Sequence, residues 1–408
     1  MNQLRAFHRD PLAFFQSLVG THGHRVRFRM GLWTFYLLND PVSVHFVLSH
    51  HTRHFRKGPG LEDSNPLTGQ GLLTQEGEGW VQQRRRLAPA FRRENVDAMI
   101  PWLDQVFDEF QSTLVPGQLI DLESTMLHLS LLMALRTVFG DSQVTLSDVH
   151  AIGDNVQWLM THFYHRSRSI WRFPYSFPAF NRRYHAHARK LREAIHRLAP
   201  ETRPYATVWP GLAADPIRRD HEMLTLVIAG YETTGHAMAW ALDLLSRHPD
   251  IAEHVINESY QSQAPDPTTH PWTHSVVNET LRLYPSVWLL SRRPLASVTV
   301  DDIHFNPEDI ILISPWLLHH AADWFDEPST FRPQRWMGDW KPIPYTYIPF
   351  GAGPRVCIGQ HLALKEMLLA LSRFMARFDV AVSGPRAVYP GLTLNARYPL
   401  WATIRPRT

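Results

Sequence analysis

The feature that most constrains this chain is the stretch 350–359, which surrounds the only cysteine of the sequence with residues that shape a backbone. Gly351 and Gly353 can adopt backbone angles closed to other residues, and Pro354 stiffens the loop before Cys357. Apolar residues then recur at helical spacing from 360 to 378. The sulfur is therefore predicted at a helix N-terminus, where free amides and the helix dipole favour a thiolate.

A thiolate at a helix end can be a nucleophile, a redox thiol or an axial ligand to heme iron. Arg355 favours the role of axial heme ligand for this thiolate. Its guanidinium can pair with an anion lying flat against the loop, and heme carries two such anions, its propionates. Phe350 would pack beside the sulfur, and Gly359 would let a flat macrocycle approach the backbone. A buried structural cysteine is the usual role of an isolated thiol and is the alternative here.

This stretch resembles the heme-thiolate signature of the cytochrome P450 family and matches its Phe-x-x-Gly-x-Arg-x-Cys-x-Gly pattern at every fixed position. The resemblance implies that Cys357 is the axial ligand to the iron of heme b, with Arg355, Phe350 and Gly359 also in the heme site. It implies a mainly α-helical fold with small β-sheets (α+β). Heme would lie between a long distal helix and the cysteine-bearing loop and helix.

The clearest long helix is predicted over 219–247, and its middle carries features that weaken a helix. Two glycines and two adjacent threonines lie there, and Glu232 with Thr233 forms a polar pair in an apolar segment. The segment is similar to the family's oxygen-activation motif. That similarity implies close approach to heme at Gly230 and proton handling by Glu232 and Thr233. An exposed Glu beside a Thr bonded to the preceding turn is the structural alternative.

Three further residues are predicted to hold the heme carboxylates. Trp80 and Arg84 are four residues apart and so share a helix face, where both can donate to one carboxylate. In the family, a Trp and a basic residue at this spacing hold a propionate, whereas a surface cation–π pair is the alternative. Arg292 is by resemblance another propionate partner.

A structural ion-pair network is implied by a second motif. Glu279 and Arg282 match the family's Glu-x-x-Arg pattern on a helix predicted over 274–284, and Arg335 in a downstream loop is the implied third member. Many relatives carry Glu where this chain has Gln334, so a charge contact made by that Glu is not expected in this chain.

The substrate pocket is predicted from apolar residues near these motifs. The segment 161–192, which mixes arginines with aromatic residues, corresponds to the family's lid, and we favour a solvated helix face with aromatics beneath. The pocket candidates are Leu72, Leu226, Ala229, Val287, Trp288 and Leu289.

The remaining elements are predicted from periodicity. Strands are expected within 25–38 and 298–313 and as a hairpin at 391–403, and helices over 41–48, 100–113, 119–139 and much of 149–163. The resemblance covers almost the whole chain. We therefore expect one catalytic domain over 1–408, without a fused reductase or ferredoxin.

Composition excludes several classes of protein. Hydrophobic residues make up 44% and charged residues 19%, which is typical of a globular chain. One cysteine supports neither an internal disulfide nor a zinc or iron–sulfur site, so a reducing compartment, the cytoplasm, is expected. The charge of +3 is dispersed and predicts no nucleic-acid binding. Charges at Arg5, Arg9 and Asp10 argue against a signal peptide or membrane anchor, so we expect a soluble monomer.

The resemblance implies a monooxygenase that uses O2 and inserts one oxygen atom into a lipophilic small molecule, such as a fatty acid or terpenoid, by hydroxylation or epoxidation. Electrons from NAD(P)H would arrive through a separate ferredoxin or flavodoxin with its reductase, and Arg92 and Arg93 would help to form the docking face. The alternatives are a peroxide-driven peroxygenase, a heme-thiolate gas sensor or electron carrier, and an isomerase or dehydratase. The pair Glu232 and Thr233 weighs against the first and third of these.

Overall fold

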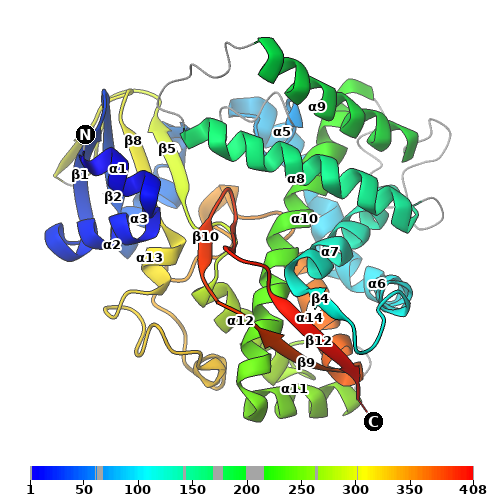
Figure 1. The fold of residues 1–408 in the computed structure, drawn as a ribbon. Helices are drawn as coiled ribbons and strands as arrows, with labels where there is room; N and C mark the ends of the chain where they lie inside the picture. The colour runs from blue at the N-terminus through cyan, green and yellow to red at the C-terminus, as the bar shows by residue number, and fades with distance from the viewer. Residues whose placement is uncertain are drawn as a thin grey trace.

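The computed structural model describes residues 2–59, 61, 68–140, 144–168, 178–198, 216–261, 265–300 and 302–407. A large helical body lies beside a smaller region built on a five-stranded sheet (Figure 1). The α-helices are α1 (Asn2–Arg9), α2 (Pro11–His22), α3 (Pro41–His45), α5 (Gly77–Leu87), α6 (Arg93–Ser112), α7 (Leu122–Phe139), α8 (Leu146–Arg168), α9 (Pro178–Leu198), α10 (Pro216–Arg247), α11 (Pro249–Gln261), α12 (Pro271–Leu283), α13 (Pro315–His319) and α14 (Gln360–Arg377). The strands are β1 (Arg25–Met30), β2 (Trp33–Leu38), β3 (Phe55–Lys57), β4 (Leu119–Asp121), β5 (Leu290–Pro294), β6 (Val298–Val300), β7 (Ile303–Phe305), β8 (Ile310–Ile313), β9 (Phe378–Ser383), β10 (Val388–Pro390), β11 (Leu394–Ala396) and β12 (Trp401–Pro406).

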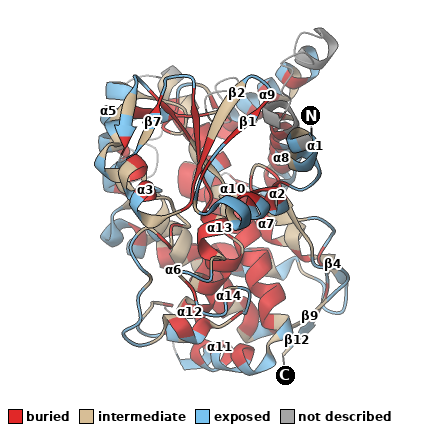
Figure 2. Ribbon diagram, turned by 90° about the vertical axis from the view of Figure 1, so that its left-hand side faces the viewer, coloured by how far each residue is buried: buried red, intermediate tan, exposed pale blue. Residues whose placement is uncertain are grey.

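Helix α10 runs through the centre of the helical body, and buried residues concentrate on it and on α12 and α14 (Figure 2). It packs against α7 at very close range. A β-carbon at Gly235 would lie 2.9 Å from the Cα of Leu127, so only glycine allows this approach. One of the two glycines that weaken the helix therefore serves helix packing.

The five-stranded sheet has the order β1-β2-β8-β5-β3 and separates two apolar clusters. Strand β8 shows why: Ile310 and Leu312 face the cluster under α2, whereas Ile311 and Ile313 face the cluster around α3. Strand β3 pairs with β5 at the edge, which places Lys57 opposite Arg292. The sheet thus brings two cations from distant parts of the sequence together.

The predicted fold class is confirmed, with corrections at element boundaries. Residues 119–121 were predicted within a helix but form β4, because Asp121 pairs with Trp401 of β12. The predicted hairpin at 391–403 is wrong in its pairing: β11 pairs with β10, whereas β12 pairs with β9 and β4. Of the predicted lid, 161–192, residues 169–177 lie outside the described residues, and the remainder belongs to the end of α8 and the first part of α9. In the part of the chain that the structure describes, none of the helices combines the length and apolar character needed to cross a bilayer.

Candidate heme site

The cysteine loop is a tight turn held by its own backbone. Gly351 and Gly353 have φ values of 73° and 70°, in the left-handed region that favours glycine. A β-carbon at Gly353 would lie 2.0 Å from the carbonyl oxygen of Leu48, so no other residue fits there. The amide of Cys357 donates to the carbonyl of Phe350 over 2.9 Å, and α14 begins three residues later with Gly359 at its N-cap.

The thiol of Cys357 is accessible to solvent yet surrounded by protein, so it lines a recess. Burial raises the pKa of this thiol, while the Gly359 amide and the charge of Arg84 lower it, and burial has the larger effect. The helix end alone therefore does not produce the expected thiolate. A metal cation at the sulfur would displace the proton.

Between residues 222 and 245 of α10, four residues on one face are accessible while the others are buried. Ala229 is exposed, and Leu226, Gly230 and Thr233 are half-buried, although the residues around them are mostly buried. Their spacing of three and four residues places them on a single stripe. Leu226 also packs against a cluster that includes Leu72, with Trp80 and Ile358 at its edge. The stripe, helix α5 and the cysteine loop therefore converge.

The predicted carboxylate-binding residues also come together. The indole of Trp80 contacts two guanidinium groups, and its ring centroid lies 5.7 Å from the guanidinium of Arg84 and 5.1 Å from that of Arg355. Arg292 is buried beside Arg355, and its Nε has no hydrogen-bond partner. Burial and the charge of Arg355 lower the pKa of Arg292 to about 10. On this side of the site, the positive charges of the arginines are not fully balanced by acidic side chains.

Two members of this cluster were not predicted from the sequence. Lys57 is buried, and its Nζ donates to the carbonyls of Leu72 and Gln75 over 3.1 and 2.7 Å. Glu76 forms a bidentate ion pair with Arg355 and accepts the amide of Lys57 over 2.8 Å. The sequence did distinguish Lys57, because the chain has only four lysines among its 41 lysine and arginine residues.

These residues fit a flat dianion. The basic side chains of Lys57, Arg292 and Arg355 interact with the carboxylate of Glu76. Arg84 contacts the same indole as Arg355, and a second acid, Glu222, acts on Lys57, so four basic groups face two acids. Burying unpaired charge is costly, so an anionic group is expected to complete the cluster. The two propionates of heme supply such charge, and Cys357 lies close enough to Arg84 for their charges to interact. The donor set therefore matches heme bound through the thiol.

A pH-dependent uptake of protons by heme binding follows from Lys57. Burial lowers the pKa of Lys57 to about 7, from an ordinary value of 10.5. Between these values the unfolded chain holds a proton that the folded heme-free chain lacks, so this group makes heme-free stability rise with pH. A propionate nearby raises the Lys57 pKa again. At pH 8, heme binding is expected to take up close to one proton at this site.

Isothermal titration of heme into the heme-free protein, in buffers of different ionisation enthalpy, measures this uptake. Lys57→Met should lower it by most of one proton, and it should also stabilise the heme-free chain below pH 7. Arg56→Met on the same strand, where Arg56 is exposed, is the matched control. Equal proton uptake in wild type and Lys57→Met would contradict the assignment.

The predicted acid and alcohol occupy different surroundings. Glu232 is buried and accepts a hydrogen bond from Thr393 over 3.1 Å, and burial raises its pKa. The hydroxyl of Thr233 donates to the carbonyl of Ala229 over 2.8 Å. Thr233 therefore lies on the accessible stripe while Glu232 lies behind it, in contact with the turn between β10 and β11.

The pocket candidates divide into two groups. Leu226, Ala229, Val287 and Leu289 keep accessible surface, whereas Trp288 and Leu72 are buried. Trp288 is buried in the cluster that contains Phe15, and its indole donates to the carbonyl of Gly391 over 2.8 Å. Leu289 packs against the same cluster, and Leu72 is buried with its amide donating to Glu222 over 3.0 Å.

The ion-pair residues form a fully buried network. The carboxylate of Glu279 accepts from Arg282 over 2.8 and 2.9 Å, from Arg335 over 3.1 Å and from the indole of Trp336 over 2.8 Å. Arg282 also donates to the carbonyls of His319, Pro328 and Thr330. The network thereby fixes α12 to the loop 326–336. The side chain of Gln334 takes no part in these hydrogen bonds.

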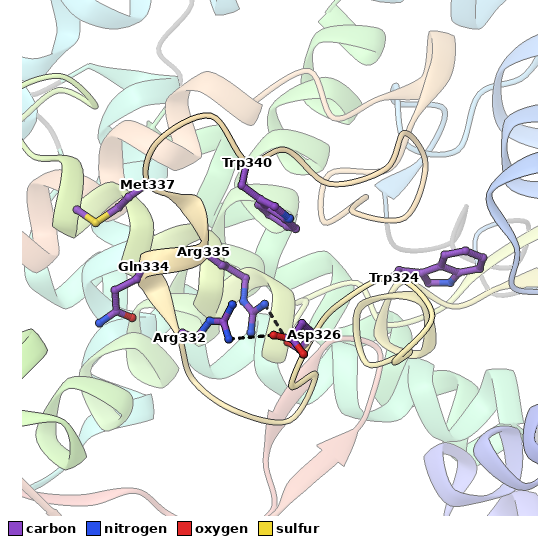
Figure 3. A pocket seen from close by; sticks show the side chains of 7 residues that line it. All are labelled: Trp324, Asp326, Arg332, Gln334, Arg335, Met337 and Trp340. Carbon is purple, nitrogen blue, oxygen red and sulfur yellow. Dashed lines mark hydrogen bonds and ion pairs between the residues drawn. The ribbon is translucent and has the colours of Figure 1, made fainter.

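A hollow of about 270 Å³ lies beside this network, between Trp324, Trp340 and the loop that carries Arg332 and Arg335 (Figure 3). Both arginines are already paired, Arg332 with Asp326 and Arg335 with Glu279. We therefore assign this hollow to loop packing and separate it from the recess at Cys357.

Comparison with known proteins agrees with this geometry. The family model for Cytochrome P450 matches residues 1–203 and 219–394. The chain is 30% identical to cyclooctat-9-en-7-ol 5-monooxygenase from Streptomyces melanosporofaciens, covering 95% of this chain and 88% of that protein. It is 26% identical to pentalenene oxygenase from Streptomyces avermitilis, covering 97% and 93%. The crystal structure of CYP175A1 from Thermus thermophilus superposes with a TM-score of 0.83 at 27% identity, covering 99% and 97%.

A thiol in a recess, a cationic cluster and a central helix with an accessible stripe define a heme-thiolate protein. The chain belongs to the cytochrome P450 family. It is a monooxygenase, an oxidoreductase that incorporates oxygen from O2 and uses heme. Enzymes of this family generally receive electrons from redox partners and act on lipophilic substrates.

Proposed function

We propose that this monooxygenase oxidises a cyclic terpenoid by C–H hydroxylation or epoxidation. The observation that carries the proposal is the accessible apolar surface of Leu226 and Ala229 on α10, with Val287 nearby in sequence to the β5 wall. Such a surface offers area to a rigid hydrocarbon and few polar partners. The names of the two Streptomyces relatives, which refer to cyclooctat-9-en-7-ol and pentalenene, support this substrate class.

Within this proposal, some residues of the chain would bind heme and others would handle protons. Cys357 would bind the iron, and Lys57, Trp80, Arg84, Arg292 and Arg355 would hold the propionates, while Phe350, Gly230 and Gly359 border the heme. Bound heme supplies an iron centre whose thiolate ligand favours O–O cleavage. Thr233 would orient a proton toward the reacting oxygen, and Glu232, whose raised pKa keeps it protonated at higher pH than an exposed glutamate, would supply it.

Spectral titration tests the substrate class. Cyclic sesquiterpenes and diterpene alcohols are expected to convert the ferric protein from low to high spin, and product formed under labelled oxygen should carry one labelled atom. A shift with long-chain fatty acids alone would replace the terpenoid proposal. Turnover with peroxide that far exceeds turnover with reductase would favour the peroxygenase, and the absence of any shift would favour a sensor or electron carrier.

We further propose that residues 1–408 act as one catalytic domain, as a monomer in the cytoplasm, and that NAD(P)H supplies electrons through a separate ferredoxin or flavodoxin with its reductase.

The docking face for this redox partner would include Arg92 and Arg93. Both are exposed, and they follow Phe91, whose ring lies 3.8 Å from the β-carbon position of Gly359. An acidic partner bound there would approach the cysteine side of the heme.

Charge reversal tests this docking face. Arg92→Glu with Arg93→Glu is expected to slow the first electron transfer from ferredoxin, by about 10-fold or more at low salt, and to flatten its salt dependence, because steering depends on charge. Stopped-flow reduction under carbon monoxide measures the rate. Reversing Arg9 and Arg29, which are exposed on α1 and β1, is the control. Unchanged rates in the first variant would remove these arginines from the docking face.

A further inference from the structure

The turn 71–75, which lies just before α5, is fastened at Leu72 by two buried ionisable side chains. The carbonyl of Leu72 accepts a hydrogen bond from Nζ of Lys57, on β3, over 3.1 Å. The amide of the same residue donates to Oε2 of Glu222, on α10, over 3.0 Å. Lys57 also donates to the carbonyl of Gln75 over 2.7 Å and so holds the turn at two points. We call Lys57 and Glu222 the Leu72 clamp.

The turn 71–75 is compact and lies directly on α10. The carbonyl of Gly71 accepts the amides of Thr74 and Gln75 over 3.0 and 2.9 Å, which closes the turn on itself. A β-carbon at Gly71 would lie 2.0 Å from Oγ1 of Thr225 and 2.8 Å from the carbonyl oxygen of His221. Only glycine therefore allows the turn to approach the helix this closely.

The turn covers the accessible stripe of α10 at its N-terminal end. Glu222 is four residues before Leu226, the first residue of the stripe, so the two share a helix face. Leu226 is half-buried, whereas Glu222 is fully buried where the turn lies over it. The side chain of Leu72 belongs to the cluster against which Leu226 and Trp80 pack. Leu72 is thus an apolar side chain that borders the stripe at this end.

A buried carboxylate on this face of α10 is costly unless it has a task. Burial raises the pKa of Glu222 to about 7. Among the neighbours that favour its charged form, the amide of Leu72 has the largest effect, ahead of the charges of Arg218 and Lys57. The hydrogen bond to the turn is therefore the main interaction that stabilises this charge.

We propose that Lys57 and Glu222 are positioning residues that hold Leu72 against the α10 stripe, and that Leu72 thereby limits the size of the ligand that the pocket admits. If the turn were released from Glu222, Leu72 would withdraw and a bulkier ligand would fit. The inference rests on the proposed function, because it takes the α10 stripe to be a wall of the substrate pocket. Lys57 also belongs to the cationic cluster, so variants of Glu222 separate the turn from the propionates.

Hydrogen exchange tests the clamp without turnover. Peptides that contain the amide of Leu72 are followed by mass spectrometry in the heme-loaded protein. Glu222→Leu removes the acceptor at similar volume and is expected to speed exchange in the turn 71–75 by about 10-fold or more. Glu222→Gln keeps an oxygen for the amide and should stay within about threefold of wild type. Asp220→Leu is the matched control on α10, since the partners of Asp220 include Arg219 and His196, and it should behave like wild type.

Azole titration of the ferric protein tests the pocket. Imidazole and clotrimazole both bind heme iron through a nitrogen, but clotrimazole also carries a bulky chlorinated triphenylmethyl group. Leu72→Ala is expected to raise the affinity for clotrimazole relative to imidazole by about 5-fold or more, because it shortens the wall. Glu222→Leu should shift this ratio in the same direction, whereas Glu222→Gln and Asp220→Leu should stay within about twofold of wild type. Neither probe is a terpenoid, so a failed terpenoid titration leaves this test intact.

Three results would overturn the proposal. Exchange at the wild-type rate in Glu222→Leu would mean that the clamp does not hold Leu72. Exchange that is equally faster in α7, α10 and the turn would mean that Glu222 stabilises the whole fold and positions nothing. An azole ratio that stays at the wild-type value in Leu72→Ala or Glu222→Leu would mean that the clamped residue does not set the pocket size. If Glu222→Leu fails to fold, Glu222→Asp, which keeps the charge but withdraws the oxygen by one carbon, must show the same pattern in smaller measure.

Discussion

Cys357→Ala is expected to abolish the red-shifted Soret band of the reduced carbon monoxide complex and to reduce monooxygenase turnover to background. The sulfur is the one thiol in the chain, and it lies in a recess beside the cationic cluster that fits the heme propionates. Without it, no side chain at this position supplies the electron-donating ligand that favours O–O cleavage. The absorption spectrum of the purified protein, ferric and then reduced under carbon monoxide, measures the loss.

Val356→Ala is the matched control for this experiment. It removes apolar atoms from the neighbouring residue but leaves the sulfur in place, so the band should persist. A band that survives unchanged in Cys357→Ala would mean that another residue binds the iron. Heme that is absent from the wild-type protein after reconstitution would remove the heme site itself.

The second large effect concerns the stability of the fold. Glu279→Gln is expected to lower the free energy of unfolding by about 3–5 kcal/mol, because it leaves buried cations without their counter-charge. Arg282 and Glu279 are both 0% exposed and Arg335 is 3% exposed, so water cannot replace the lost charge. Urea unfolding of the heme-loaded protein, followed by tryptophan fluorescence and heme absorbance, measures the change.

An exposed acid provides the comparison. Glu253→Gln on α11 removes the same charge from the surface and should change stability by no more than about 0.5 kcal/mol. Arg282→Lys separates charge from shape: a lysine restores the charge but cannot reproduce the bidentate bond to Glu279 and the three carbonyl contacts. Equal stability of Glu279→Gln and Glu253→Gln would show that the network contributes little to folding.

The sequence predicted those parts of the site that lie in short, unusual segments. The loop around Cys357 was predicted because glycine and proline limit the backbone and a single thiol stands out. The weakened middle of α10 was equally visible, since Glu232 interrupts an apolar helix. In both cases local residue types conflict with ordinary secondary structure, which is common at functional sites.

Features that depend on pairing between distant segments were not predicted. Lys57 became part of the site because β3 pairs with β5 and sets it opposite Arg292. Residues 119–121 have helical periodicity but pair with β12, so tertiary contacts override local preference. Trp288 follows the Glu-x-x-Arg helix as a pocket residue would, yet the bond from its indole to Gly391 directs it into the core with Phe15. Single-sequence reasoning contains no information about these partners.

The contact between Gly353 and the carbonyl of Leu48 bears on how the enzyme matures. The cysteine loop is shaped against a segment from the beginning of the chain, and the hydroxyl of Tyr345 adds a second link by donating to Ser49 over 3.1 Å. Because the cysteine loop reaches its final shape against residues 48 and 49, we expect heme binding through Cys357 to follow the folding of this early segment. Chains in which the segment is misfolded are expected to lack heme.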